Sequence, residues 1–160
     1  LPIYVRNNIS FVPQDNFLFS TSIEDNVAFS EDEIKKEKVI EACKFADVDN
    51  NIVDFIDGYK TLVGERGVTL SGGQKQRISI ARAYLKDSPI MVLDDSVSAV
   101  DVKTEEKILS NIKEKRKGKT TILVSSRVST VEHLDRIIVL NEGKVEAFDT
   151  HENLLKISPT

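Results

Sequence analysis

Three short apolar runs in the second half of the chain, separated by two segments of helical character, constrain the fold most. Each run is nearly unbroken, as expected for a strand that is buried on both faces. Strands that alternate with helices in this way predict an α/β fold built on a mostly parallel sheet. The predicted strands cover residues 90–93, 121–124 and 137–140, and the predicted helices cover residues 72–86 and 103–115.

The first half of the chain is predicted to hold one strand followed by helices. Residues 9–12 form a short apolar run that ends at Pro13, and proline disfavours helix at the residue before it. Ser30 and Glu33 have the spacing of a capping box and predict the start of a helix. Residues 51–56 predict a further short helix. The apolar face of the first helix would carry Val39, Ala42, Cys43 and Ala46.

The end of the chain predicts a hairpin and a last helix. Glu142 and Gly143 favour a tight turn into a strand over residues 144–147. Thr150 can cap a helix that begins at His151. We expect His151 and the other histidine, His133, to be surface residues.

Composition indicates one globular unit and excludes several classes of function. The 160 residues include 26 acidic and 22 basic side chains, which gives no general attraction to nucleic acid or to an anionic membrane. The one basic run, residues 113–119, is expected to be a solvated helix end. Cys43 is the only cysteine, so no internal disulfide can form, and a buried thiol is expected. No apolar stretch is long enough to span a bilayer, so a membrane role requires a partner.

The segment with the strongest functional signal comes just before the helix predicted over residues 72–86. Ser71 can cap that helix, and the glycines after it allow a phosphate to approach the backbone N–H groups at its positive end. Taken by itself, such a turn can also be an ordinary loop that caps a helix. The segment reads Leu70, Ser71, Gly72, Gly73 and Gln74.

A second candidate site follows the strand predicted over residues 90–93. Asp94 and Asp95 stand at its carboxyl end, which is where open parallel sheets bind ligands. Carboxylate oxygens at this position suit Mg²⁺, which prefers oxygen ligands. The alternative, which these residues alone leave open, is that two acidic residues simply end a strand.

The string from Leu70 to Gln74 matches the signature motif of ABC transporters, and the chain resembles their nucleotide-binding domain, of the exporter type. Other segments follow in the family's order. The resemblance implies that Gln14, in the Q-loop, senses the γ-phosphate and the metal, and that Asp94 belongs to Walker B and helps to hold Mg²⁺. Asp95 stands where the family usually has the glutamate that polarises the attacking water. The D-loop would comprise Ser98, Ala99, Val100 and Asp101, of which Asp101 can also cap the next helix.

The resemblance also implies the architecture and the partners. We expect an incomplete P-loop NTPase (RecA-like) core with a mostly parallel sheet, in about residues 89–160, and an α-helical signature subdomain with the Q-loop, in about residues 13–88. ATP and Mg²⁺ would be bound at the cytoplasmic face of the cell membrane. The partners would be a transmembrane domain, fused or separate, and a second nucleotide-binding domain paired head to tail; nucleic acid is not expected. Contact with the transmembrane domain would involve the X-loop, which comprises Gly64, Glu65, Arg66 and Gly67.

Two departures from the family pattern predict a weak hydrolytic site. Asp95 is one methylene shorter than glutamate, and a displacement of about 1 Å at a catalytic group can cost about 100-fold in rate. Ser126 replaces the switch histidine and cannot carry its charge. Such changes resemble the degenerate subunit of a heterodimeric exporter, whose intact signature completes the partner's active site. The alternative is a homodimer that tolerates both substitutions.

A third departure is that no Gly-x-x-x-x-Gly-Lys-Ser/Thr string occurs in the 160 residues. The family places this Walker A loop before the Q-loop, upstream of Leu1. We therefore expect this polypeptide alone to be inactive in ATP hydrolysis, with some apolar core surface exposed or covered by another copy. Two other classes remain open: a soluble ABC-class ATPase that acts on nucleic acid or ribosomes, and a non-catalytic interaction module.

Overall fold

The computed structural model describes residues 2–64 and 68–157, which divide into two units after Val124. The first unit holds a parallel sheet and most of the helices, and the second holds a hairpin and two short helices. Among the described residues, no helix is both long and apolar enough to cross a membrane.

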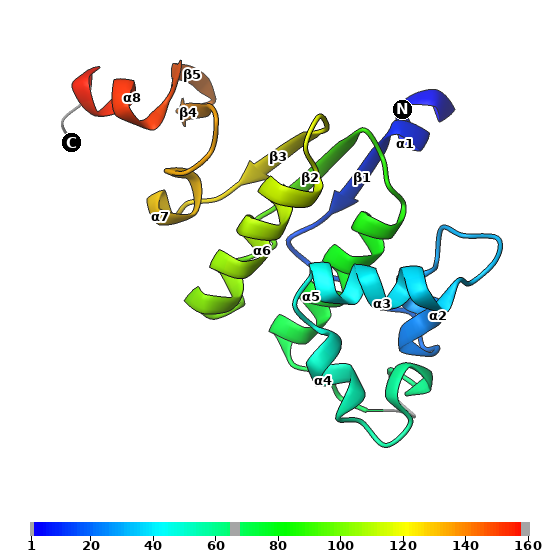
Figure 1. The fold of residues 1–160 in the computed structure, drawn as a ribbon. Helices are drawn as coiled ribbons and strands as arrows, with labels where there is room; N and C mark the ends of the chain where they lie inside the picture. The colour runs from blue at the N-terminus through cyan, green and yellow to red at the C-terminus, as the bar shows by residue number, and fades with distance from the viewer. Residues whose placement is uncertain (1, 65–67, 158–160) are drawn as a thin grey trace. The chain divides into compact units, whose positions relative to one another are not determined.

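The sheet of the first unit has three parallel strands in the order β1-β2-β3. They comprise β1 (Ile9–Val12), β2 (Ile90–Asp94) and β3 (Thr120–Val124). β2 lies in the middle, and α6 (Val102–Lys115) connects it to β3, as the alternation of apolar runs predicted (Figure 1). The predicted α/β class and parallel sheet are confirmed.

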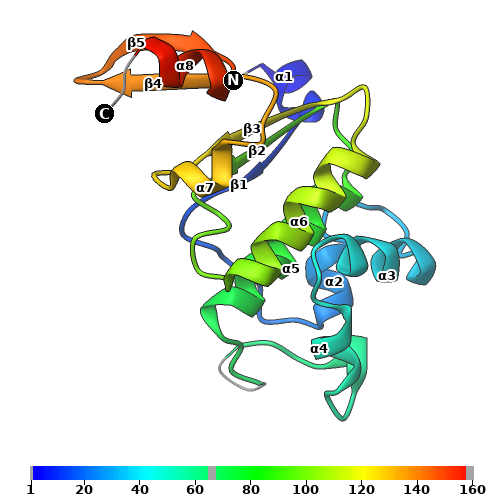
Figure 2. The ribbon, with the colours of Figure 1, turned by 60° about the vertical axis from the view of Figure 1, so that its left-hand side comes forward.

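One face of this sheet is covered and the other is open. Met91 and Leu93 are fully buried on the covered face, where α5 (Gly72–Leu85) and α6 lie on the same side of the strands (Figure 2). Phe11, Ile122 and Val124 alternate with the buried residues and are about half exposed. The prediction of strands buried on both faces is therefore wrong for the described residues, whereas the expected exposed apolar surface is present.

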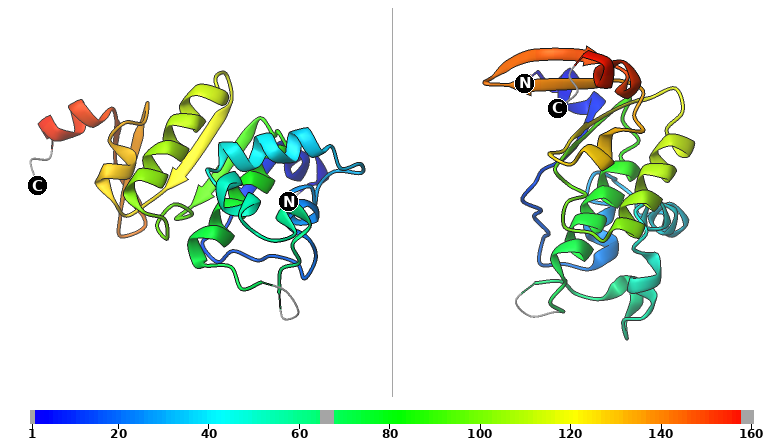
Figure 3. Two further views of the ribbon diagram at one scale, coloured as in Figure 1. Left: turned by 60° about the horizontal axis from the view of Figure 1, so that its bottom comes forward. Right: turned by 90° about the vertical axis from the view of Figure 1, so that its left-hand side faces the viewer.

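The helical part of the first unit is built around α5, against which α2 (Ile23–Val27) and α3 (Lys36–Phe45) pack (Figure 3). The predicted apolar face of α3 is buried, and Cys43 on it has no exposed surface. Three further short elements complete this unit: α1 (Ile3–Asn8), α4 (Asp49–Val53) and a 3₁₀ turn, η1 (Gly58–Lys60).

Two helix starts differ from the prediction. Ser30 does not cap α3: it lies in the turn after α2, in which the Glu31 N–H donates to the Ala28 carbonyl, and α3 begins at Lys36 without a side-chain cap. In this part of the chain a serine caps α2 instead: the Ser22 hydroxyl accepts from the Asp25 N–H. The helix predicted over residues 51–56 begins earlier, as α4.

The basic run at the end of α6 is only partly solvated. Arg116 is 3% exposed, because its guanidinium donates to the Thr121 hydroxyl at 3.1 Å and to the Ser88 carbonyl at 3.2 Å. Lys119 pairs with Asp87 across the same end of the sheet. The prediction of a solvated helix end is therefore wrong for Arg116, which joins α6 to the neighbouring strand ends.

The second unit contains α7 (Val128–Val131), an antiparallel hairpin of β4 (Ile137–Asn141) and β5 (Lys144–Asp149), and α8 (His151–Ile157). Both residues of the predicted Glu142–Gly143 turn have positive φ, as such a two-residue turn requires. The Thr150 hydroxyl accepts from the Asn153 N–H, which confirms the predicted cap.

Residues 137–140 were predicted to join the parallel sheet, and this prediction is wrong. Within the described ranges β4 pairs with β5 alone, because the two-residue turn brings β5 alongside it to supply its backbone partners. Side chains such as Ile138 and Leu140 are exposed. His133 is exposed as predicted, and His151 is partly exposed.

Candidate functional site

The turn before α5 presents backbone amides to solvent. Ser71 begins the helix with a capping box: its hydroxyl accepts from the Gln74 N–H at 3.2 Å, and its own N–H donates to the Gln74 side-chain oxygen at 2.9 Å. Leu70 is buried and anchors the turn, whereas Ser71 and Gly72 are exposed. A Cβ placed on Gly72 would have nothing within 4 Å. The turn is therefore open to an anion at the positive end of a 14-residue helix.

The two acidic residues after β2 take different directions. Asp94 ends the strand and is paired in register with Val124, so alternation places its side chain on the open face of the sheet. Asp95 leaves the strand with φ 46°, in the left-handed region that aspartate tolerates better than most residues. Its N–H still donates to the Val124 carbonyl at 3.0 Å. Both carboxyl groups thus stand at the carboxyl end of the parallel sheet.

Gln14 follows the neighbouring strand, β1, and its side chain contacts Asp95. It follows Pro13 after β1, and its side-chain N–H donates to the Asp95 carboxylate at 3.4 Å. The parallel pairing of β1 and β2 brings together these residues, which are 81 positions apart in the chain. Two of the predicted site residues are therefore in contact.

The donor set at this edge of the sheet fits Mg²⁺. Asp94, Asp95 and Gln14 offer carboxylate and amide oxygens, which this hard cation prefers. Among residues 2–64 and 68–157, no group of three or more His, Cys, Asp or Glu side chains is placed to hold a metal ion. Mg²⁺ is usually held by one or two carboxylates together with substrate phosphates, so an open site of this kind suits it.

The predicted D-loop connects Asp95 to α6. The Ser98 hydroxyl donates to the Asp95 carbonyl at 2.8 Å. Asp101 caps α6 as predicted, because its carboxylate accepts from the Thr104 N–H at 3.1 Å and from the Thr104 hydroxyl at 2.7 Å. These hydrogen bonds from Thr104 lower the pKa of Asp101 below its usual value, so the cap remains charged near neutral pH.

Gln76 is a site residue to which the sequence assigned no role. It is 3% exposed on α5, donates to the Asp95 carbonyl at 3.3 Å and accepts from the Ala99 N–H at 3.2 Å. Gly73, one turn earlier, lies so close to the D-loop that an added Cβ would be 3.0 Å from the Ala99 carbonyl oxygen. The feature of the sequence that could have indicated Gln76 is that a polar residue falls on the side of α5 that is buried.

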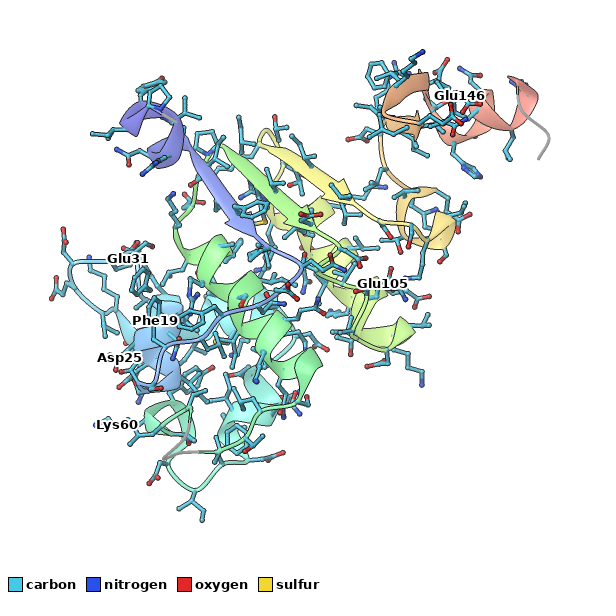
Figure 4. The ribbon with its side chains drawn as sticks, turned by 180° about the vertical axis from the view of Figure 1, so that it is seen from behind. Phe19, Asp25, Glu31, Lys60, Glu105 and Glu146 are labelled. Carbon is cyan, nitrogen blue, oxygen red and sulfur yellow. The ribbon has the colours of Figure 1, made fainter. Side chains whose placement is uncertain are left out.

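Asn26 and Arg82 form a second network that the sequence did not indicate. Asn26 has no exposed surface; its side-chain oxygen accepts from the Phe19 N–H and from the Arg82 guanidinium, both at 2.8 Å. Its amide donates to the Phe19 carbonyl at 3.0 Å, and Arg82 also donates to the Phe17 carbonyl at 3.1 Å. Phe19 is labelled in Figure 4. The network ties the segment after Gln14 to α5.

A groove lies between that segment and the residues around Gly64 and Val68. Gly64 has φ 111°, and an added Cβ would be 2.6 Å from the Ser20 hydroxyl, so only glycine fits. Glu65, Arg66 and Gly67 lie outside the described residues. The groove is lined mainly by Phe17, Leu18, Val63, Gly64, Val68 and Lys75.

Ser126 belongs to the second unit, where it is exposed two residues after the end of β3. The predicted site residues that are described and lie before β3 all belong to the first unit. The signature turn, the acidic strand end, Gln14 and the D-loop are therefore parts of one unit.

Comparisons with known proteins agree on one family. Residues 3–98 match the family profile described as ABC transporter. The chain is 48% identical to the multidrug resistance-like ATP-binding protein MdlA of Buchnera aphidicola over 154 residues, which are 96% of this chain and 26% of that protein. It is 43% identical to the ATP-dependent lipid A-core flippase of Legionella pneumophila over 94% of this chain and 26% of that protein.

A solved structure is similar over nearly the whole chain. A bacterial Atm1-family ABC exporter with ATP bound matches with a TM-score of 0.90 and 39% identity, over 96% of this chain and 27% of that one. The chain thus spans about a quarter of the length of the relatives it matches. The chain belongs to the ABC transporter family, as part of an ATP-binding domain with the P-loop NTPase fold that is close in sequence to those of exporters.

Proposed function

We propose that the chain is part of the ATP-binding domain of an ABC exporter, which couples ATP binding and hydrolysis to the export of a substrate across a membrane. The observation that supports this proposal best is the turn of Ser71, Gly72 and Gly73, which presents the exposed backbone of Gly72 at the positive end of α5. The domain works at the cytoplasmic face of the cell membrane, joined to a transmembrane domain. ATP is the substrate, and Mg²⁺ is the metal.

The signature turn serves a nucleotide that is held by another subunit. A second nucleotide-binding domain pairs head to tail with this one, and residues from Leu70 to Gln74 close over its ATP. The open surface at Gly72 supports this role, because a phosphate can reach the backbone there without meeting a side chain. No nucleic acid takes part.

Asp94 and Gln14 hold Mg²⁺ at the carboxyl end of β2. The metal, when bound, neutralises charge on the phosphates. Asp95 orients the attacking water, and its contact with Gln14 supports a role for that glutamine in sensing the nucleotide. Ser126 takes the place of the switch histidine.

The nucleotide site that Asp95 serves hydrolyses ATP slowly. The carboxyl group of Asp95 is already engaged by Gln14 at 3.4 Å, and its side chain is shorter than glutamate. Ser126 is uncharged and short. We infer a heterodimer in which this chain holds the slow site and its intact signature completes the partner's active site. The 160 residues by themselves contain no Walker A string and turn over no ATP.

Contact with the transmembrane domain occurs at the groove beside Gly64, together with Glu65, Arg66 and Gly67. Phe17 on the groove is 66% exposed, which supports docking of an apolar helix there. The Asn26–Arg82 network attaches the segment that carries Phe17 to α5, so a movement of α5 would also move this side of the groove.

The test of the signature assignment is Ser71→Arg in the complete transporter with its partner. The arginine places bulk where the phosphate must lie, so ATP turnover falls to near background. Ser110→Arg is the matched control, since Ser110 is exposed on α6 away from the turn. Unchanged turnover in Ser71→Arg would reject the assignment.

The slow site is tested by restoring the family residues. Asp95→Glu together with Ser126→His, in the same assembly, should raise ATP turnover measurably, up to the level of two active sites instead of one, since a correctly placed base recovers part of the loss expected from misplacement. No rise would mean that these two positions do not limit the site. The alternative of a homodimer would instead appear as two equivalent sites in a nucleotide-trapping experiment.

A further inference from the structure

The Gln76 side chain bonds α5 to both ends of the turn between Asp95 and Ala99. Its amide donates to the Asp95 carbonyl at 3.3 Å, and its oxygen accepts from the Ala99 N–H at 3.2 Å. The side chain is 3% exposed, so water does not replace these bonds easily. Both hydrogen-bonding groups of Gln76 are therefore used on this turn.

The turn that Gln76 holds carries the acidic group of the candidate site. Asp95 has φ 46°, a conformation that persists where neighbouring bonds fix it. Its carbonyl accepts from Gln76 and from the Ser98 hydroxyl at 2.8 Å, which sets the orientation of the peptide. A change at this carbonyl therefore turns the Asp95 carboxylate relative to Gln14.

Gln76 also lies close in the chain to the signature turn at the start of α5. Gln76 lies on the first turns of α5, three residues after Gly73, whose backbone packs against the Ala99 carbonyl. Ser71 and Gln74 lock the start of that helix with a reciprocal cap. The signature turn and Gln76 therefore belong to the same hydrogen-bonded start of α5.

We propose that Gln76 is a positioning residue that couples the signature turn to the Asp95–Ala99 turn of the same chain. The inference rests on the proposed function, in which the signature serves the partner's nucleotide and Asp95 serves the chain's own. Gln76 then links the two nucleotide sites of the dimer through one subunit. A shift of α5 when the signature closes on a phosphate moves the Asp95 carbonyl and the D-loop with it.

The test uses the complete transporter with its partner. Gln76→Met keeps the length of the side chain and removes both hydrogen bonds. Gln76→Glu keeps the acceptor for the Ala99 N–H and removes the donor to the Asp95 carbonyl. Ser79→Ala is the matched control, because Ser79 is buried on the same helix and its hydroxyl has no hydrogen-bond partner within the described part of the chain.

Two measurements are compared: steady-state ATP turnover, and hydrogen exchange at the Ala99 amide with and without a non-hydrolysable ATP analogue. Gln76→Met should lower kcat by about tenfold with KM for ATP within about twofold, because the signature turn that completes the partner's active site loses its link to the D-loop while nucleotide binding is kept. The Ala99 amide should exchange about tenfold faster in Gln76→Met and stay protected in Gln76→Glu. Ser79→Ala should match the wild type in both.

A role limited to helix stability would lower the melting temperature without separating Gln76→Met from Gln76→Glu at the Ala99 amide. Wild-type kcat and unchanged Ala99 exchange in Gln76→Met would overturn the inference while leaving the proposed function intact. Absence of turnover in the wild type would refute the proposed function. The exchange measurement needs no turnover, so unchanged exchange would still overturn the inference in that case.

Discussion

Replacing Asn26 with alanine should cost far more stability than the loss of one amide suggests. Asn26 is fully buried, and its side chain is the partner of both the N–H and the carbonyl of Phe19, at 2.8 and 3.0 Å. The other groups that it contacts keep a second partner: the Phe19 carbonyl accepts from the Thr21 N–H at 2.8 Å, the Ser22 carbonyl accepts from the Asn26 N–H, and Arg82 donates to Phe17. Asn26→Ala therefore leaves the Phe19 N–H without a partner and removes the bond to the Arg82 guanidinium.

The expected loss follows from that N–H and from the lost bond to Arg82. A buried group left without a hydrogen bond costs roughly 1–3 kcal/mol, and a hydrogen bond to a charged group contributes roughly 1.5–3 kcal/mol, so Asn26→Ala should lower the free energy of unfolding by about 3 kcal/mol. Asn111→Ala is the matched control: Asn111 is 7% exposed, and its amide makes one bond, to the Phe45 carbonyl at 2.8 Å. The control should lose about 1 kcal/mol.

Urea unfolding of the chain, followed by circular dichroism, measures both losses. With a slope of about 2 kcal/mol per molar urea, Asn26→Ala should shift the midpoint by about 1.5 M and the control by about 0.5 M. The slopes should stay equal, because neither change alters the surface exposed on unfolding. Equal midpoints in the two variants would refute the claim that the Asn26 network fixes Phe19 on α5.

Three other predictions concern separate features. Gly72→Ala should stabilise the chain by about 0.5–1 kcal/mol in urea unfolding, and Gly73→Ala should not, because its Cβ would meet the Ala99 carbonyl at 3.0 Å. Hydrogen bonds from two neighbouring hydroxyls lower the pKa of Asp25, so this carboxylate stabilises the fold above about pH 4 and loses the effect as pH falls through its folded pKa. Asp25→Asn should therefore lose less stability than the wild type on acidification. An equal loss in the two proteins would contradict this. Burial raises the pKa of Cys43 to about 12, so iodoacetamide at pH 8 should modify it only after unfolding, as mass spectrometry would detect.

The sequence was sufficient for features that depend on neighbouring residues. The predicted caps at Ser71 and Asp101 need only residues three positions away, and both are present. The Glu142–Gly143 turn depends on two residues that accept positive φ. Parallel pairing of two apolar runs through a helix follows from the alternation itself.

The sequence was not sufficient where contacts join distant segments. The strand over residues 137–140 is apolar like the others, but a hairpin partner within ten residues competes for its backbone groups, and periodicity cannot decide between the two pairings. Arg116 lies in a run of lysines, and only the fold shows that its guanidinium reaches the ends of neighbouring strands. Ser30 has a capping pattern, yet the end of α2 uses that segment as a turn.

By itself, the sequence determined the class of fold, the signature turn and the order of the candidate site residues, because each depends on local pattern or on an unbroken string. Only the tertiary structure decided that Gln14 contacts Asp95 and that Gln76 joins α5 to the D-loop. These pairs are 81, 19 and 23 residues apart, and side-chain hydrogen bonds form only where the packed sheet and helix bring their atoms within about 3.5 Å.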